Sequence, residues 1–312
     1  MTMNLYRLRA TAPRAGIAFV ALLAAAALAP LAHAEEWTKS YTISGRANVR
    51  VDTNDGSVRI ATSDTKQVEF VVDYDGYKLD KNLHIESRQD GDHVEISARV
   101  SGHWGISWGV NHRSIRIVVR MPKDADLRID TGDGSVETQP LSGNLKIHTG
   151  DGSVRSDAVT GNVDIVTGDG GITLEGARGD VRLRTGDGHI DARNIDGKLD
   201  ATSGDGHIKI DGRFDALNIK TGDGSIDAHV LPGSKLVSSW NIHTGDGSVD
   251  LVLPGELQAN IDASTNDGRI SLGIPVTVEG TFSNSQIHGK MNGGGQPLTI
   301  HTGDGSIRLN HT

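Results

Sequence analysis

The 312-residue sequence contains no cysteine, and only 4% of its residues are aromatic. Without cysteine there is no disulfide framework, no thiolate metal site and no lipid-bearing cysteine. An apolar fraction of 36% with so few aromatics excludes a deep globular core but suffices for a thin one. Basic residues are outnumbered, with 31 Lys and Arg against 40 Asp and Glu. This acidic balance argues against nucleic acids and anionic membranes as partners.

Long apolar runs are also scarce, since the sequence has one, near the N-terminus. Three arginines precede the run IAFVALLAAAALAPLA, which ends in the small-residue pattern AHA at Ala34. A basic start, a short apolar middle and an A-x-A end predict a signal peptide over residues 1–34, cleaved after Ala34. A transmembrane anchor is the alternative, but it needs about 20 apolar residues and no cleavage site. We therefore expect an exported protein, periplasmic or extracellular, with no stable membrane insertion after cleavage.

The sequence is rich in one turn, TGDG, which occurs ten times with small variations. The copies begin at Thr53, Thr131, Thr149, Thr167, Thr185, Ser203, Thr221, Thr244, Thr265 and Thr302. From Asp133 to Asp223 the aspartates of the turn recur at a constant step of 18, and the later copies follow at steps of 23, 21 and 37. A fixed period of about 20 residues is typical of stacked-repeat architectures.

Apolar residues hold fixed places within each period. One series follows the turn directly, with Val136, Val154 and Ile172 as its first members, and a second series alternates as in Leu145 and Ile147. This alternation predicts short strands, and no segment of the repeat has helical spacing. One coil cannot bury an apolar face alone, whereas stacked coils can. The sequence therefore predicts an all-β fold, a parallel β-solenoid (β-helix or β-roll) with coils of about 18 residues and irregular capping ends.

Charged residues support stacking in register. If residues one period apart become neighbours at the strand spacing of about 4.8 Å, two outward columns have mostly alternating signs. The columns are Lys146, Asp164, Arg182, Asp200 and Glu137, Arg155, Thr173, Asp191, Lys209, Asp227. Each exposed pair contributes only about 0.2–1 kcal/mol, so the pattern indicates neighbours more than it indicates stability.

The repeated turns are interpreted as corners of the coils. We expect Gly132 and Gly134 to adopt backbone angles that other residues resist, Asp133 to form an Asx-turn, and the Thr131 hydroxyl to act similarly. The structural turn ladder comprises Asp133, Asp151, Asp169, Asp187, Asp205 and Asp223. Its like charges repel, so a bound cation such as Ca²⁺ is the alternative to purely structural turns. Calcium-binding repeats follow GGxGxDxUx, whereas each coil here has one GDG corner, so we expect no cofactor.

The run VVRMPKDADLRIDTGDGSVETQPLSGNLKIHTGDGSV, residues 118–154, closely resembles the bacterial putative-adhesin family of exported β-strand-repeat proteins. The resemblance covers roughly residues 40–312 and is clearest from Met121 to Gly224. It implies a single-chain parallel β-solenoid at the bacterial envelope, with a function mostly unassigned. It also implies no catalytic residues that could be carried over to this chain.

The regular repeat does not extend over the whole chain. Residues 35–127 hold strand-like runs with one TNDG corner, so we interpret them as an N-terminal β-strand region that caps the solenoid, with a separate small β-domain as the alternative. Residues 128–312 form the GDG-repeat solenoid. An insertion at 274–298 could cap the other end, because open sheet edges invite aggregation.

Two groups of residues are candidate binding sites. The loop SGHWGISWGVNHRS holds Trp104, Trp108, His103, His112 and Arg113, which suit a partner or glycan surface. We favour the alternative that the two tryptophans plug the end of the solenoid, so that replacing both lowers stability. Transition-metal candidates are His189 and His207 beside Asp187 and Asp205, although exposed turn histidines are commoner and two further ligands are lacking.

Three functional interpretations remain open. The first is an exported, non-catalytic, adhesin-like structural or interaction protein of the cell envelope, with an envelope or extracellular protein or glycan as partner. The second is a polysaccharide-acting or cation-binding β-helix protein, but repeated carboxylates fit structure better than catalysis. The third is an ice-binding solenoid, suggested by the column of threonines, although only one threonine occurs per coil. We expect no enzyme.

Overall fold

The computed structural model describes residues 35–101, 113–278 and 283–311, and these contain 26 β-strands and no helix. All described strands belong to one compact unit, Ala34–Thr312. No helix among the described residues is long and apolar enough to cross a membrane. The expected all-β fold is confirmed.

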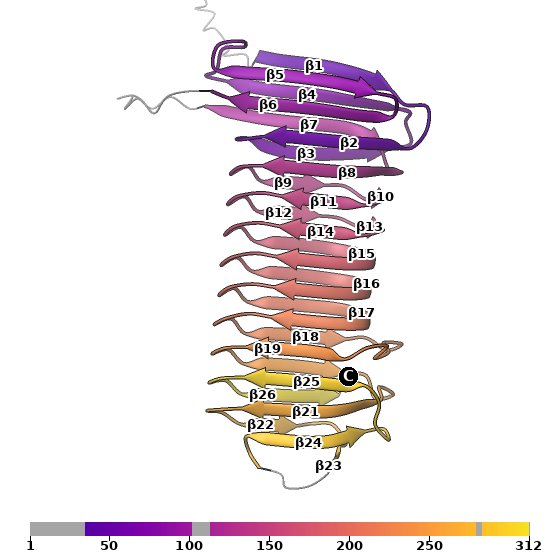
Figure 1. The fold of residues 1–312 in the computed structure, drawn as a ribbon, viewed down its shortest axis with the longest axis vertical. Helices are drawn as coiled ribbons and strands as arrows, with labels where there is room; N and C mark the ends of the chain where they lie inside the picture. The colour runs from indigo at the N-terminus through magenta and orange to yellow at the C-terminus, as the bar shows by residue number, and fades with distance from the viewer. Residues whose placement is uncertain (1–34, 102–112, 279–282, 312) are drawn as a thin grey trace, which may run out of the picture. The chain divides into compact units, whose positions relative to one another are not determined.

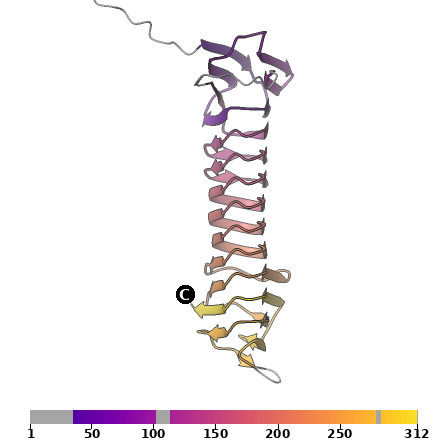
Figure 2. The ribbon, with the colours of Figure 1, turned by 90° about the vertical axis from the view of Figure 1, so that its left-hand side faces the viewer.

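The middle of this compact unit is a stack of parallel coils (Figure 1). Each coil runs along one face, turns at a TGDG corner and returns along the other face. The strands of this part are β8 (Ala125–Thr131), β9 (Val136–Thr138), β10 (Leu141–Ser142), β11 (Leu145–His148), β12 (Val154–Ser156), β13 (Val159–Thr160), β14 (Val163–Val166), β15 (Ile172–Arg184), β16 (Ile190–Thr202), β17 (Ile208–Lys220) and β18 (Ile226–Val230). Figure 2 looks onto the corner side and shows the two faces edge-on.

The stacking register is the one that the constant period predicts. Val136 pairs with Val154, Val154 with Ile172, and Ile172 with Ile190, all in parallel and all at most 2% exposed. On the other face Leu145 pairs with Val163 in the same way. Side chains alternate inward and outward along each strand, so each coil contributes a few aliphatic residues to a continuous thin core. The predicted parallel β-solenoid is confirmed.

The N-terminal part of this unit adds antiparallel strands to the stack. Its strands are β1 (Glu35–Thr42), β2 (Ala47–Thr53), β3 (Ser57–Ser63), β4 (Gln67–Asp75), β5 (Leu83–Asp90), β6 (His93–Val100) and β7 (Ser114–Pro122). β1, β4 and β7 pair antiparallel on one face, and β5 pairs antiparallel with β6 on the other. β1 and β5 are the outermost strands and are largely exposed.

The C-terminal part continues the parallel stack and then closes with antiparallel strands. Its strands are β19 (Trp240–Thr244), β20 (Val249–Leu253), β21 (Ala259–Thr265), β22 (Ile270–Leu272), β23 (Thr277–Val278), β24 (Gln286–Met291), β25 (Pro297–Thr302) and β26 (Ile307–His311). β24 pairs antiparallel with both β21 and β23. The edge-to-face contact of Phe214 and Trp240, with ring centroids 6.4 Å apart, fills the core where the regular period ends.

Stacking order departs from chain order at both ends. The β2–β3 coil lies between the β6–β7 coil and the β8–β9 coil. The β25–β26 coil lies between the β19–β20 coil and the β21–β22 coil. All ten corners therefore fall in one column, and the two TNDG variants, with Asn54 and Asn266, lie at its two ends.

Candidate functional site

The corner glycines are required by close stacking. Gly132 and Gly134 do not have positive φ, so the expectation of unusual backbone angles at the GDG corner is wrong. A Cβ atom at Gly152 would overlap the carbonyl oxygen of Gly134, and the same overlap would recur at Gly170. Positive φ occurs instead at the second turn of the coil, for example 143° at Gly161.

The corner threonines from Thr149 onward bind their coil to a neighbouring one, whereas the Thr53 hydroxyl bonds within its own corner and the Thr131 hydroxyl has no partner among the described residues. The Thr149 hydroxyl donates to the carbonyl oxygens of Gly132 at 2.9 Å and Gly134 at 3.2 Å. The hydroxyl of Thr167 repeats both bonds one coil further on. The side chains are buried, because the corner folds over them. They are therefore structural, and the outward threonine surface that an ice-binding solenoid requires is absent from the described corners.

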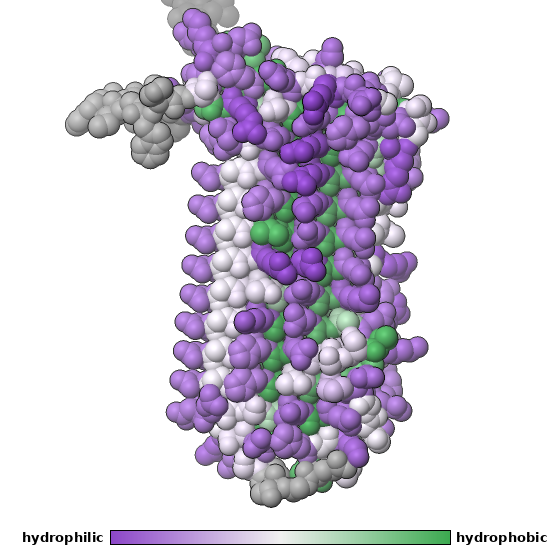
Figure 3. All heavy atoms as spheres, in the orientation of Figure 1, coloured by the Kyte–Doolittle hydropathy of each residue, from purple (hydrophilic) through white to green (hydrophobic). Residues whose placement is uncertain are grey.

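The aspartate ladder lies exposed along the corner side, and Figure 3 shows a regular hydrophilic column at this edge. A local bond from backbone to carboxylate forms at Asp55, which accepts the Gly56 N–H at 2.7 Å. Within the described residues none of the six ladder carboxylates makes a hydrogen bond or ion pair, so the Asx-turn expected at Asp133 is wrong. The corner is held instead by backbone bonds such as Gly150 N–H to Gly132 O at 2.5 Å.

The side chains of His189 and His207, the two histidine candidates for a metal site, point toward different coils. The ring of His189 lies over Gly171 on the preceding coil, where it would overlap an added Cβ atom. The His207 Nε2 atom lies 3.3 Å from a carboxylate oxygen of Asp227 on the following coil. Asp187 and Asp205 remain in the exposed ladder. In the described ranges no group of three or more His, Asp or Glu side chains is placed to hold a metal.

Four of the five candidates in the aromatic loop, Trp104, Trp108, His103 and His112, lie outside the described residues. The fifth, Arg113, stacks its guanidinium over the Tyr77 ring, 5.7 Å from the centroid. Burial raises the pKa of the Tyr77 phenol, and Asp55, 3.3 Å from its hydroxyl, raises it further, while Arg113 opposes them. Arg113 thus packs against the connection between β4 and β5.

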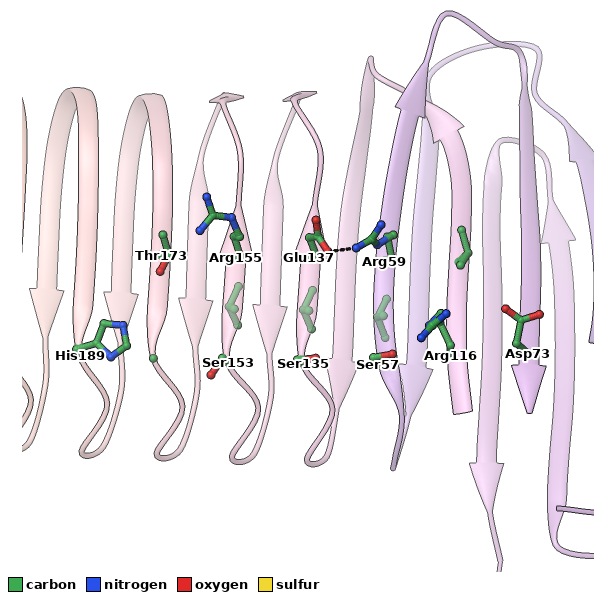
Figure 4. A pocket seen from close by; sticks show the side chains of 15 residues that line it. Ser57, Arg59, Asp73, Arg116, Ser135, Glu137, Ser153, Arg155, Thr173 and His189 are labelled. Atoms are coloured by element: carbon green, nitrogen blue, oxygen red, sulfur yellow. Dashed lines mark hydrogen bonds and ion pairs between the residues drawn. The ribbon is translucent and has the colours of Figure 1, made fainter. Parts of the chain in front are cut away.

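A hollow of about 680 Å³ lies elsewhere on the described surface, on the face formed by β3, β9, β12 and β15, with Asp73 of β4 and Arg116 of β7 at one end. Its polar lining consists of Ser57, Arg59, Asp73, Arg116, Ser135, Glu137, Ser153, Arg155, Thr173 and His189. Figure 4 shows Ser57, Ser135 and Ser153 in one row, with His189 at one end and Arg116 and Asp73 at the other. We name this hollow the serine trench.

The serine trench exists because the first outward position after the corner is small on four successive coils. Ser57, Ser135, Ser153 and Gly171 occupy that position, whereas Arg116 precedes them and His189 follows. At about 4.8 Å per coil, Arg116 and His189 lie about 24 Å apart along the stack. The second row of outward residues, in which Arg59 and Glu137 form an ion pair at 2.5 Å, makes one wall.

Two arginines of the serine trench form no ion pair or hydrogen bond with the described residues. Most arginines in the described ranges form an ion pair, and the exceptions are Arg113, Arg116, Arg155 and Arg269. Arg116 faces Asp73 across the β4–β7 pair without an ion pair, and Arg155 follows Glu137 in its column, although Glu137 is engaged by Arg59. Two guanidinium groups without an ion pair to any described residue thus line one hollow.

A second hollow, of about 510 Å³, lies on the opposite face along β14, β15, β16 and β17. Here the charges pair with each other. Lys146 and Asp164 are 3.5 Å apart, and Arg182 and Asp200 are 3.7 Å apart. The stacking register that the alternating charges predicted is confirmed on this face. The charges of this face already have partners of opposite sign. The serine trench is therefore the stronger candidate for a binding site.

Sequence reasoning did not find the serine trench. Its signal was the series Ser135, Ser153, Gly171, His189, in which small residues give way to an imidazole. The other end could not be inferred, because β3 and β7 join the stack out of chain order.

Comparison with known proteins gives a family and a set of related folds. The model of the family described as Toastrack DUF4097 matches residues 46–310. A putative adhesin from Parabacteroides merdae is 12% identical, with 88% of this chain and 96% of that chain covered and a TM-score of 0.49. A putative adhesin from Bacteroides fragilis is 11% identical, with 89% of this chain and 97% of that chain covered and a TM-score of 0.36. A putative lipid binding protein from Parabacteroides distasonis is 13% identical, with 89% of this chain and 96% of that chain covered and a TM-score of 0.35. None of the curated proteins matches this chain.

Proposed function

The chain belongs to the Toastrack DUF4097 family, and on this premise we propose that it is an exported, non-catalytic, adhesin-like interaction protein of the bacterial envelope. Its solenoid presents the serine trench to an extended partner that lies along the stack. The observation that carries the proposal is the break in the repeat, where four small residues leave a hollow beside two arginines that pair with no carboxylate of the described chain.

The arrangement of carboxylates in the serine trench supports a non-catalytic role. Hydrolysis of a glycosidic bond uses two carboxyl groups about 5–9.5 Å apart. Asp73 and Glu137 are separated by three strand spacings, about 14 Å along the stack. Glu137 is also held by Arg59. The trench therefore suits binding better than acid–base chemistry.

Export is supported by the N-terminal signal pattern and by the position of β1. Cleavage after Ala34 removes the apolar run and leaves Glu35, the first residue of β1, as the N-terminus. The mature chain then keeps all the described strands.

Site-specific photo-crosslinking in cells tests the proposal. A photoreactive residue at Ser135, in the floor of the serine trench, is expected to form adducts with an envelope component. The same residue at Asn162, in the hollow on the opposite face, is the matched control and is expected to form none. Fractionation and N-terminal sequencing of the same samples are expected to give an exported chain beginning at Glu35.

Three results would contradict the proposal. They are a cytoplasmic chain that retains the segment 1–34, identical adduct patterns from Ser135 and Asn162, and the release of new reducing ends when purified protein is incubated with envelope polysaccharide. The last result would restore the carbohydrate-active alternative.

A further inference from the structure

The serine trench carries a small excess of positive charge on an acidic protein, with Arg59, Arg116 and Arg155 against Asp73 and Glu137. Two of the four described arginines without an ion pair, Arg116 and Arg155, line it, and a third arginine, Arg59, is paired with Glu137. An arginine left without a carboxylate is the group that binds carboxylate or sulfate in a bidentate manner. We propose that the ligand of the serine trench is an acidic polysaccharide, which deepens and rests on the proposed function.

The floor of the trench suits a hydroxyl-rich chain. The hydroxyls of Ser57, Ser135 and Ser153 make no hydrogen bond within the described part of the protein, so each has a donor and two acceptor positions free. They recur at about 4.8 Å along the stack, so a polymer lying lengthwise meets one on each coil. Because the side chains are small, the polymer can approach the sheet closely.

The lining does not suit a protein partner. Hot spots of protein interfaces are enriched in Trp, Tyr and Arg and cluster in desolvated pockets at the centre of the interface. The serine trench supplies arginines but no Trp, Tyr or Phe, and its aliphatic lining is four valines, three of them buried, beside a row of serines. A partner that contributes its own hydroxyl and carboxylate groups fits this surface better than one that requires apolar pockets.

The spacing of charges separates an acidic polysaccharide from a nucleic acid. Arg116 and Arg155 lie three strand spacings apart, about 14 Å along the stack. Nucleic-acid binding at physiological salt relies on many phosphate contacts, about six to ten in a typical protein. Two free arginines fall short of that number, and Asp133 and Asp151, just before the floor serines in sequence, repel a dense row of phosphates. A hydroxylated polymer with widely spaced anionic groups matches both the small number of arginines and the presence of the nearby aspartates.

Binding of defined polymers to the mature protein tests the proposal. The probes are polygalacturonate, which carries carboxylates, dextran sulfate, which carries sulfates, and uncharged dextran. We expect at least one acidic probe to bind, and dextran to bind at least tenfold more weakly. The double variant Arg116→Gln with Arg155→Gln is expected to lose at least tenfold in affinity and about two units of salt slope.

The matched control is Arg269→Gln, which removes an arginine that lies outside the trench and forms no ion pair among residues 35–101, 113–278 and 283–311. This variant is expected to bind as the parent protein does, and the melting temperature shows that all variants are folded. The comparison of the two acidic probes assigns the anionic group as carboxylate or sulfate.

The proposal is overturned if neither acidic polymer binds, if dextran binds equally well, or if the double variant loses no more than Arg269→Gln. These failures differ from a failure of the proposed function. Photo-crosslinking from Ser135 would still capture a partner, and that partner would then not be an acidic polysaccharide.

Discussion

Thr131 and Thr167 occupy the same place in their coils, yet their hydroxyls differ in hydrogen bonding. The Thr167 hydroxyl donates to the carbonyl oxygens of Gly150 at 3.1 Å and Gly152 at 2.9 Å. The Thr131 hydroxyl is buried and has no partner, because the Thr53 corner that precedes it has a different shape. A buried polar group without a partner destabilises the fold, whereas a satisfied one contributes. The two threonines therefore form a natural matched pair.

Replacing these threonines by valine separates the hydrogen bond from the packing, because valine has nearly the same shape. Thr167→Val is expected to lower the free energy of unfolding by about 1–3 kcal/mol, since it removes the hydroxyl that clamps two coils. Thr131→Val is expected to be neutral or stabilising. Chemical denaturation of both variants measures the difference. Equal losses would show that the clamp contributes nothing beyond packing.

The residues of the corner show how far sequence reasoning extends. That glycine is needed in TGDG was predictable from its repetition, but the reason was not. A glycine within a turn usually signals positive φ, whereas Gly152 and Gly170 are required because the neighbouring coil lies too close for a Cβ atom. This contact belongs to the stack, so no single corner reveals it.

At the scale of the strands, the columns of outward residues determine local electrostatics. One column brings Lys220, His243 and His301 together through the pairings of β17, β19 and β25. The imidazole rings of His243 and His301 are stacked, with centroids 5.2 Å apart and planes 9° from parallel. Burial lowers the pKa of His243, and His301 and Lys220 lower it further. The folded protein therefore disfavours the protonated form of His243.

This stack predicts a loss of stability in mild acid. Below the ordinary histidine pKa of 6.5, the unfolded chain takes up a proton at His243 more readily than the folded one, so stability falls from about pH 6.5 down to the lower folded pKa. His243→Gln is expected to flatten this part of the profile of melting temperature against pH.

The control for His243→Gln is His148→Gln. His148 lies in the same column, but its neighbours on β8 and β14 are Asp130 and Val166. The same flattening in both variants would mean that the stacked pair is not its source.

Register along the strands was predictable where the period is constant. The alternation of Lys146, Asp164 and Arg182 required parallel neighbours one period apart, and β11, β14 and β15 pair in that register. The serine trench was not predictable, because it combines β9 and β12 with β3 and β7, which enter the stack from outside the period. When the coils that form a site stack in an order different from their order in the chain, no regular spacing in the sequence reveals the site.

For the described body as a whole, the ends of the stack differ from its middle. In the middle each coil lies on the coil that precedes it in sequence. At the C-terminal end β25 pairs with β19 on one side and β21 on the other, and β26 pairs likewise with β20 and β22. The coil of β25 and β26, which is last in the sequence, therefore lies between two coils that precede it in the sequence. Steps of 23, 21 and 37 signalled irregularity there, but spacing alone does not specify which coil inserts.

Deletion of one regular coil tests whether the coils of the middle are interchangeable. Removing residues 167–184 takes out one full period, so Val154 can pair with Ile190, and the core continues at the cost of one like-charge contact between Asp164 and Asp200. The shortened protein is expected to keep the oligomeric state of the parent protein and to unfold cooperatively, because repeat stacks tolerate the loss of an internal unit. Light scattering and thermal melting measure both properties.

A deletion of equal length at the C-terminus is expected to behave differently. Removing residues 295–312 takes out β25 and β26, which pair β19 with β21 and β20 with β22, and so leaves one edge of each of these four strands unpaired. Exposed parallel edges associate readily, so this variant is expected to form soluble oligomers or aggregates in the same measurements. If the internal deletion is as damaging as the terminal one, the coils are not interchangeable units, and the inserted last coil has no special part in closing the stack.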